Sequence, residues 1–197
     1  MVEKARDGAI QAALAFAQEH DPDLDHAVQV AENSLALFDA TRELHGLGDW
    51  ERTLLHAAAL MHDTGYENRA DKHHKGSRDL IVESDLAEFS RRELMMVACV
   101  ARYHRGAEPL PKHAVYRDLA PADQTVVEQL AALIRIADGL DRTHLGVMQA
   151  VCLQRTRGGI CFHVKQRRPN ETDIWGGMRK RALFERVFGV TVEIVAH

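Results

Sequence analysis

The hydrophobic pattern divides the chain into a long helical part and a short part of mixed character. Apolar residues recur at helical spacing through six segments, which we expect to pack on one another as helices. These segments are residues 2–19, 22–44, 49–65, 73–81, 90–105 and 123–143. From residue 147 onward, two alternating strand-like runs precede a helical segment over 171–188 and a last strand over 190–195. The pattern therefore predicts a mainly α fold, with a helical domain over 1–146 and a small β-β-α-β appendage over 147–197.

Local end signals set several of the predicted boundaries. Asp21-Pro22 is typical of a helix start, with a capping carboxylate followed by proline at the first helical position. Ser90 and Glu93 have the spacing of a capping box. At the end of the segment over 49–65, which we expect to be the central helix, Gly65 is expected to adopt the left-handed conformation that ends many helices.

Composition and charge narrow the class of protein. The chain has 197 residues, 46% of them hydrophobic, which suits one globular domain with a small addition. Its net charge of −4 does not favour a broad nucleic-acid surface. Three scattered cysteines are typical of a reducing compartment, and neither a signal peptide nor a membrane-spanning apolar run is recognisable. We therefore expect a cytoplasmic protein with no membrane partner.

The central helix carries the first sign of chemistry. The run LLHAAALMHDTG is apolar nearly all the way round, yet it ends in His62-Asp63. The carbonyl end of a helix favours a cation, and apolar surroundings favour neither a lone carboxylate nor a lone imidazolium. A bound metal ion satisfies both conditions.

Further ligand-type residues fall on inward faces of other predicted helices. His26, His104 and Asp138 each lie on the apolar stripe of a separate helix or at its end, and His74 adds another point. Inward faces converge in a bundle core, where metal sites are often built. Together with the His-Asp pair they make six ligands, enough for two ions about 3.5–4 Å apart with Asp63 between them. Imidazole and carboxylate ligands favour iron or manganese, with magnesium or zinc as alternatives.

The order of these residues resembles the HD superfamily of metal-dependent phosphohydrolases. The strings AALMHDTG, HHKGSRDLI, ARYHR, LIRIADGLDRTH and KRALFERVFG are similar to the C-terminal HD-type region of the exopolyphosphatase/guanosine pentaphosphatase (Ppx/GppA) family. The similarity runs from about Leu24 to the end and implies an HD-domain helical bundle. It implies these metal ligands: His26, His62, Asp63, His74, His104 and Asp138.

One ambiguity and two departures from the family limit what the resemblance implies. His73 is an alternative to His74, because spacing does not choose between neighbours at a helix start. Gly76 stands where the family often has a second histidine, as HKHS. The actin-like domains that hold the polyphosphatase site of long members have no counterpart here, so exopolyphosphatase activity is not implied.

We therefore expect a metal-dependent phosphohydrolase that acts on a small phosphorylated substrate or nucleotide. Its catalytic residues would be Asp63, Lys75 and Arg142, with Arg105 as a further phosphate ligand. The alternative is a non-catalytic module that binds a nucleotide for regulation or forms a homodimer through its sheet edges.

Overall fold

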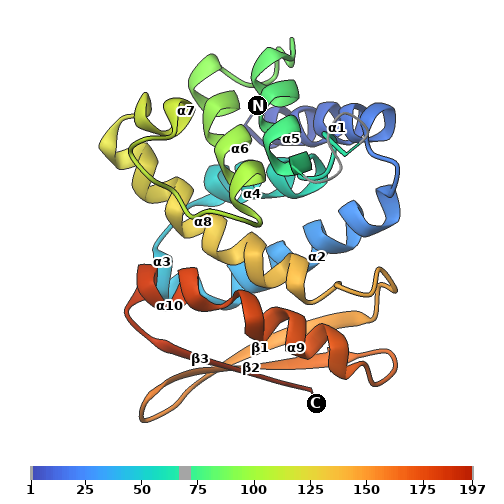
Figure 1. Cartoon of the computed structure of the whole chain (residues 1–197), viewed down its shortest axis with the longest axis vertical. Coiled ribbons are helices and arrows are strands. Elements are labelled where there is room, and N and C mark those ends of the chain that lie inside the picture. Colours follow the sequence, from blue (N-terminus) through green and yellow to red (C-terminus); the bar gives the residue numbers. More distant parts are fainter. Residues whose placement is uncertain (1, 67–71, 197) are drawn as a thin grey trace.

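The computed structural model describes residues 2–66 and 72–196, and within them it contains ten helices and three strands (Figure 1). The helices are α1 (Val2–His20), α2 (Leu24–Ala40), α3 (Arg42–His45), α4 (Asp49–Leu60), α5 (His73–Glu83), α6 (Arg91–Tyr103), α7 (Ala114–Arg117), α8 (Pro121–Gly139), α9 (Glu171–Lys180) and α10 (Ala182–Phe188). The strands are β1 (Met148–Arg155), β2 (Gly159–Gln166) and β3 (Thr191–Ala196). The predicted mainly α class is confirmed.

Helix α4 lies in the middle of the bundle, in contact with α1, α2, α6 and α8. Leu55, Ala57, Ala58 and Ala59 are fully buried on different sides of this helix. Burial on all sides explains why the segment is apolar around its whole circumference. It also means that the turn after α4 begins inside the bundle rather than at its surface.

The end of α4 differs from the prediction at Gly65. Glycines with positive φ occur at other positions, but Gly65 is not among them, so the expected left-handed stop is wrong. Gly65 is needed instead because the turn touches α5. A Cβ atom there would lie 2.1 Å from the Ser77 amide nitrogen and 2.5 Å from the His73 carbonyl oxygen. This close approach places the start of α5 against the His62-Asp63 turn.

The start of α2 also differs from the prediction. The capping residue is Asp23 rather than Asp21, because the Asp23 carboxylate accepts a hydrogen bond from the His26 amide at 3.2 Å. The capping box at the start of α6 is confirmed, with Ser90 and Glu93 bonded reciprocally. Most of the predicted loop at 66–72 falls outside the described residues.

The C-terminal part forms the predicted β-β-α-β unit, with the single predicted helix split into α9 and α10. Strand order is β1-β2-β3, β1 antiparallel and β3 parallel to β2. Helices α9 and α10 lie between the sheet and α8 (Figure 1). A Cβ atom on Gly139 would lie 2.5 Å from the Gly176 carbonyl oxygen, so α8 and α9 touch backbone to backbone. Among the described helices, none is long and apolar enough to cross a bilayer.

Candidate metal centre

Four of the six predicted ligands, His26, Asp63, His104 and Asp138, line one pocket of about 420 Å³. Its walls come from the first turn of α2, the turn after α4, the start of α5, the end of α6, the end of α8 and the end of α9. The described residues that line it are His26, Asp63, Tyr66, His73, His104, Arg105, Gly106, Asp138, Arg142, His144 and Lys180. His62 is fully buried next to it. The bundle therefore brings together residues from positions 26 to 180.

Two of the imidazoles are held in the same way. His62 Nδ1 donates to the Ala59 carbonyl at 2.7 Å, and His104 Nδ1 donates to the Ala101 carbonyl at 2.7 Å. Carbonyl oxygens only accept, so both Nδ1 atoms carry a hydrogen. Burial lowers the pKa of His104 well below its ordinary value, which leaves its Nε2 lone pair free. Nε2 of His62 is buried and has no hydrogen-bond partner among the described residues.

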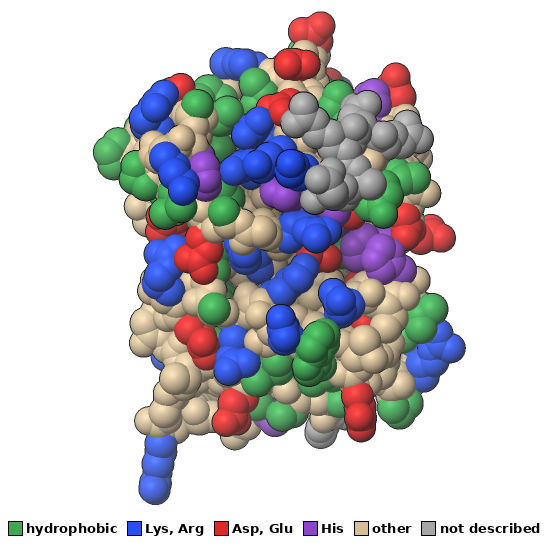
Figure 2. Space-filling view, in the orientation of Figure 1, with side chains coloured by type: hydrophobic (Ala, Val, Ile, Leu, Met, Phe, Trp, Pro, Cys, Tyr) green, Lys and Arg blue, Asp and Glu red, His purple; other side chains and the backbone are tan. Residues whose placement is uncertain are grey.

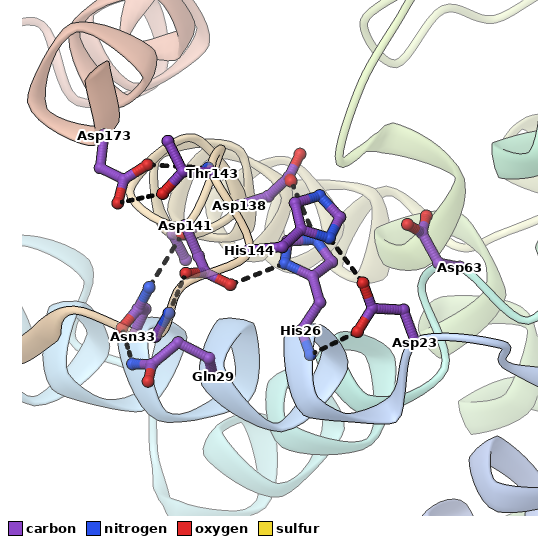
Figure 3. Close-up of polar contacts among 12 residues, drawn as sticks. Asp23, His26, Gln29, Asn33, Asp63, Asp138, Asp141, Thr143, His144 and Asp173 are labelled. Carbon is purple, nitrogen blue, oxygen red and sulfur yellow. Dashed lines mark hydrogen bonds and ion pairs between the residues drawn. The ribbon is translucent and has the colours of Figure 1, made fainter. Parts of the chain in front are cut away.

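His26 is oriented by an acidic residue instead of a carbonyl. Its Nδ1 lies 2.8 Å from Asp141 Oδ2, and its Nε2 faces Asp138 Oδ1 at 3.6 Å (Figure 3). Burial disfavours the imidazolium, but the two carboxylates that face the ring, Asp138 and then Asp141, outweigh it and raise the pKa of His26 to about 10. The surroundings of Nε2 therefore favour positive charge, whether a proton or a metal ion.

The two carboxylates face these Nε2 atoms. Asp63 Oδ2 lies 3.6 Å from His62 Nε2, and Asp63 Oδ1 lies 3.5 Å from His104 Nε2. Burial opposes ionisation of Asp63, but the positive charge that His62 carries when protonated and the hydrogen bond from His73 hold the pKa of Asp63 well below the usual range. Asp138 is half-buried, and a contact with the Lys180 ammonium, followed by His26, holds its pKa well below the usual range.

The residues present fit a metal ion. One ligand atom each from His26, His62 and Asp138 lie within 4.8 Å of one another, as do one each from His62, Asp63 and His104. A nitrogen lone pair that faces a carboxylate oxygen in a buried site is unfavourable unless a cation lies between them. Histidines with Nδ1 bonded to a carbonyl or carboxylate and Nε2 directed inward are the usual arrangement around protein-bound metals.

The two neighbouring histidines of α5 occupy different places. His73 is buried, lines the pocket, and has Nε2 3.1 Å from Asp63 Oδ1. His74 lies next to Gly106, where its ring is 6.4 Å from that of His104, and the pocket lining does not include it. Burial and then Arg102 lower the pKa of His74 to about 4. The structure therefore places His73, rather than His74, against the cluster.

The predicted phosphate ligands also divide into two groups. Arg142 and Arg105 line the pocket, and Arg105 Nη1 lies 3.2 Å from His73 Nε2. Lys75 is described but is not among the lining residues. The prediction for Lys75 rests on its place next to a ligand position in sequence, but one residue along a helix turns a side chain by about 100°.

Three residues of the site are not among the candidates that the sequence predicts. Lys180, from the predicted appendage, reaches Asp138 because α9 packs on α8. Asp141 orients His26 from the turn after α8. The His144 ring stacks on His26 with centroids 3.8 Å apart, and its Nδ1 lies 2.7 Å from Asp23 Oδ2 (Figure 3). His144 is the described non-glycine residue with positive φ, at 55°, a conformation that marks local constraint.

A helical bundle in which separate helices bring histidine and aspartate side chains into one buried cluster defines an HD-type domain. The comparison with known families agrees with this class. Residues 10–171 match the family model described as Ppx/GppA phosphatase, domain III. The chain therefore belongs to the Ppx/GppA phosphatase domain III family, which confirms the resemblance noted in the sequence and relates the protein to phosphatases.

Proposed function

We propose that the protein is a metal-dependent phosphohydrolase that cleaves a phosphoester or nucleotide substrate at the histidine–aspartate cluster. The observation that carries the proposal is the shared orientation of His26, His62 and His104. In each of them Nδ1 is hydrogen-bonded to an oxygen atom, and Nε2 is directed towards a carboxylate oxygen 3.5–3.6 Å away. Membership of a phosphatase-related family supports the reaction class.

The shape of the cluster favours two ions over one. Asp63 directs Oδ1 towards His73 and His104 and Oδ2 towards His62. A carboxylate whose two oxygens face different imidazoles suits a bridge between two ions. The ligand set of imidazoles and carboxylates favours iron or manganese, with magnesium or zinc as alternatives. On this geometry we propose His73 as the α5 ligand in preference to His74.

Bound divalent ions would supply a water molecule of lowered pKa and polarise the phosphoryl oxygens. The remaining work falls to the chain. Arg105, Arg142 and Lys180 line the same pocket and place positive charge where phosphoryl oxygens would lie. The position of Arg142 is restricted by a cation–π contact, because its guanidinium lies 5.6 Å from the centre of the Trp175 ring. We propose Arg142 and Arg105 as the phosphate ligands, since Lys75 lies outside the lining.

The test is reconstitution followed by a substrate panel. Chelator-treated protein is reloaded with manganese, iron(II), magnesium or zinc and assayed for phosphate-ester cleavage of bis-p-nitrophenyl phosphate, nucleotides, alarmones and cyclic dinucleotides. We expect activity to return with metal and Asp138→Asn to lose at least about 100-fold, more than outer residues around metal sites usually cost. The exposed Asp85→Asn is the matched control and should remain active. Absence of cleavage with every ion contradicts the proposal.

A second candidate function is a non-catalytic regulatory or dimerisation module. One observation favours it: within the described chain, β1 and β3 each pair on one side only, so two sheet edges are available to a partner. Light scattering with and without metal separates the candidates. A stable dimer that cleaves nothing on the panel favours the module, whereas a monomer that cleaves a phosphoester favours the hydrolase.

A further inference from the structure

A second, strongly basic pocket opens beside the metal centre. It has a volume of about 250 Å³ and shares Arg105, Gly106, Arg142 and Lys180 with the metal pocket. Its remaining wall comes from Arg135 and from α9, through Trp175, Gly176 and Arg179. Figure 2 shows Lys and Arg side chains gathered across this face, next to histidines. The two pockets are therefore parts of one continuous surface.

The arginines of this pocket are not neutralised by neighbouring acids. Among the residues that the structure describes, Arg105, Arg142 and Arg179 have no carboxylate partner within ion-pair distance. By contrast, Arg42, Arg52 and Arg92 elsewhere on the surface each pair with an aspartate. Although the protein has a net charge of −4, this unpaired basic cluster creates a local positive field that attracts anions.

Trp175 holds two of these arginines in place. The guanidinium carbon of Arg142 lies 5.6 Å from the centre of the indole ring, and that of Arg179 lies 5.1 Å from it. Trp175 itself is 51% exposed, which is high for a large aromatic residue. Cation–π contacts of this kind restrict where a guanidinium lies without using its N–H groups. The N–H groups remain available for two-point hydrogen bonds to phosphate.

Arg135 has a different part in the pocket. It donates to the carbonyls of Tyr103 at 3.0 Å and of Gly106 at 2.6 Å. These bonds fix the segment after α6 that carries Arg105. Arg135 therefore shapes the wall, while Arg105, Arg142 and Arg179 supply the free charge.

We propose that this pocket, formed by Arg105, Arg142, Trp175 and Arg179, binds a second phosphate group of the ligand whose first phosphate lies at the metal centre. Trp175 and Arg179 lie beyond residue 171, where the match to the family model ends. The pocket would make the protein selective for ligands with at least two phosphates over simple monoesters. Because that ligand is the substrate of the proposed hydrolase, the substrate class rests on the proposed function.

Binding without metal tests the pocket separately from catalysis. Inorganic tripolyphosphate and orthophosphate are titrated into chelator-treated protein by calorimetry. We expect tripolyphosphate to bind more tightly than orthophosphate, and Arg179→Gln to weaken tripolyphosphate at least about tenfold, as loss of a charged two-point contact predicts. Arg168→Gln, an exposed arginine outside both pockets, is the matched control and should bind as the wild type.

Fluorescence gives a second readout that does not depend on affinity alone. The chain has two tryptophans, and Trp50 donates to Glu93 on another part of the surface. In a Trp50→Phe variant the emission therefore comes from Trp175. We expect tripolyphosphate to change this emission, because the guanidinium groups on the ring would turn to the ligand, and we expect Arg179→Gln to reduce the change.

The outcomes separate the pocket from the reaction. Equal binding of tripolyphosphate by wild type and Arg179→Gln, with unchanged Trp175 emission, overturns the pocket even where a phosphoester is hydrolysed. Arginine-dependent binding by a protein that hydrolyses nothing supports the pocket and contradicts the hydrolase. Where hydrolysis occurs, Arg179→Gln should raise KM for substrates with two or more phosphates by a larger factor than it raises KM for bis-p-nitrophenyl phosphate.

Discussion

The Nε2 atom of His104 lies 3.5 Å from the Asp63 carboxylate, and the hydrogen of this imidazole is on the opposite nitrogen. Two electron-rich atoms therefore face each other inside the bundle. The same relationship recurs at His62, whose Nε2 faces the other oxygen of Asp63. Because this relationship occurs at both oxygens of Asp63, it indicates a site that binds a cation.

The two histidines that begin α5 give a direct comparison. His73 Nε2 lies 3.1 Å from Asp63 Oδ1, whereas His74 lies beside Gly106 outside the pocket lining. We expect His73→Ala to weaken manganese binding by at least about tenfold and His74→Ala to weaken it less. Isothermal titration of both variants measures the difference. A larger loss in His74→Ala would restore the ligand assignment that the resemblance implied.

The contact between α8 and α9 links the C-terminal unit to the site, and a substitution at Gly176 tests this link. A Cβ atom on Gly176 would lie 2.2 Å from the Gly139 carbonyl oxygen and 3.1 Å from Arg142 Cβ. We expect Gly176→Ala to lower the free energy of unfolding by about 1–3 kcal/mol, as overpacking usually does. It should also move Lys180 away from Asp138.

Gly158→Ala is the matched control, because a Cβ atom there meets nothing within 4 Å. Chemical denaturation of both variants gives the comparison. Equal stability of the two variants would show that the helices separate without cost, and that the C-terminal unit is only loosely joined to α8.

His56 should make the fold sensitive to acid. Burial and then the charge of Arg52 lower the pKa of His56 from its ordinary 6.5 to about 4. Between these values the unfolded chain binds a proton that the folded protein does not, so stability falls as the pH drops from 6.5 towards 4. We expect His56→Gln to lose less stability than the wild type over this interval.

Thermal unfolding at several pH values measures this effect. At pH 7.5 the imidazole is neutral in both states, so the difference between variant and wild type there is the reference. Parallel melting curves for the two proteins down to pH 4 would contradict the lowered pKa of His56.

Most of the fold could be predicted from the sequence, because hydrophobic spacing and capping residues are local signals for helices. The apolar circumference of α4 and the capping box at Ser90 follow from spacing alone, and the structure has both. The role of Gly65 does not follow from spacing, because it depends on α5, which packs on this glycine from another part of the chain. Spacing does not choose the cap of α2 either, because Asp21 and Asp23 both lie within reach of the helix start and only the backbone path decides between them.

The residues of the candidate site also fall into those that spacing predicts and those whose position depends on tertiary packing. His26, His62, Asp63, His104 and Asp138 could be predicted to meet because each lies on an inward face or at its end, and the structure brings them together. Neighbours at a helix start differ by about 100° in direction, which spacing does not resolve, so His73 and His74 remained alternatives. Lys180 gave no signal, since its position depends on how the C-terminal unit packs on α8.

Metal stoichiometry is the decisive measurement for two ions at the histidine–aspartate cluster. Wild type and Asp63→Asn are dialysed against manganese and analysed by mass spectrometry of the metal, with Asp85→Asn as the control. We expect up to two ions per chain in the wild type and in the control. We expect fewer than one in Asp63→Asn, because the bridging carboxylate is lost. A wild type that retains no divalent ion, or an Asp63→Asn variant with full occupancy, would contradict the metal centre.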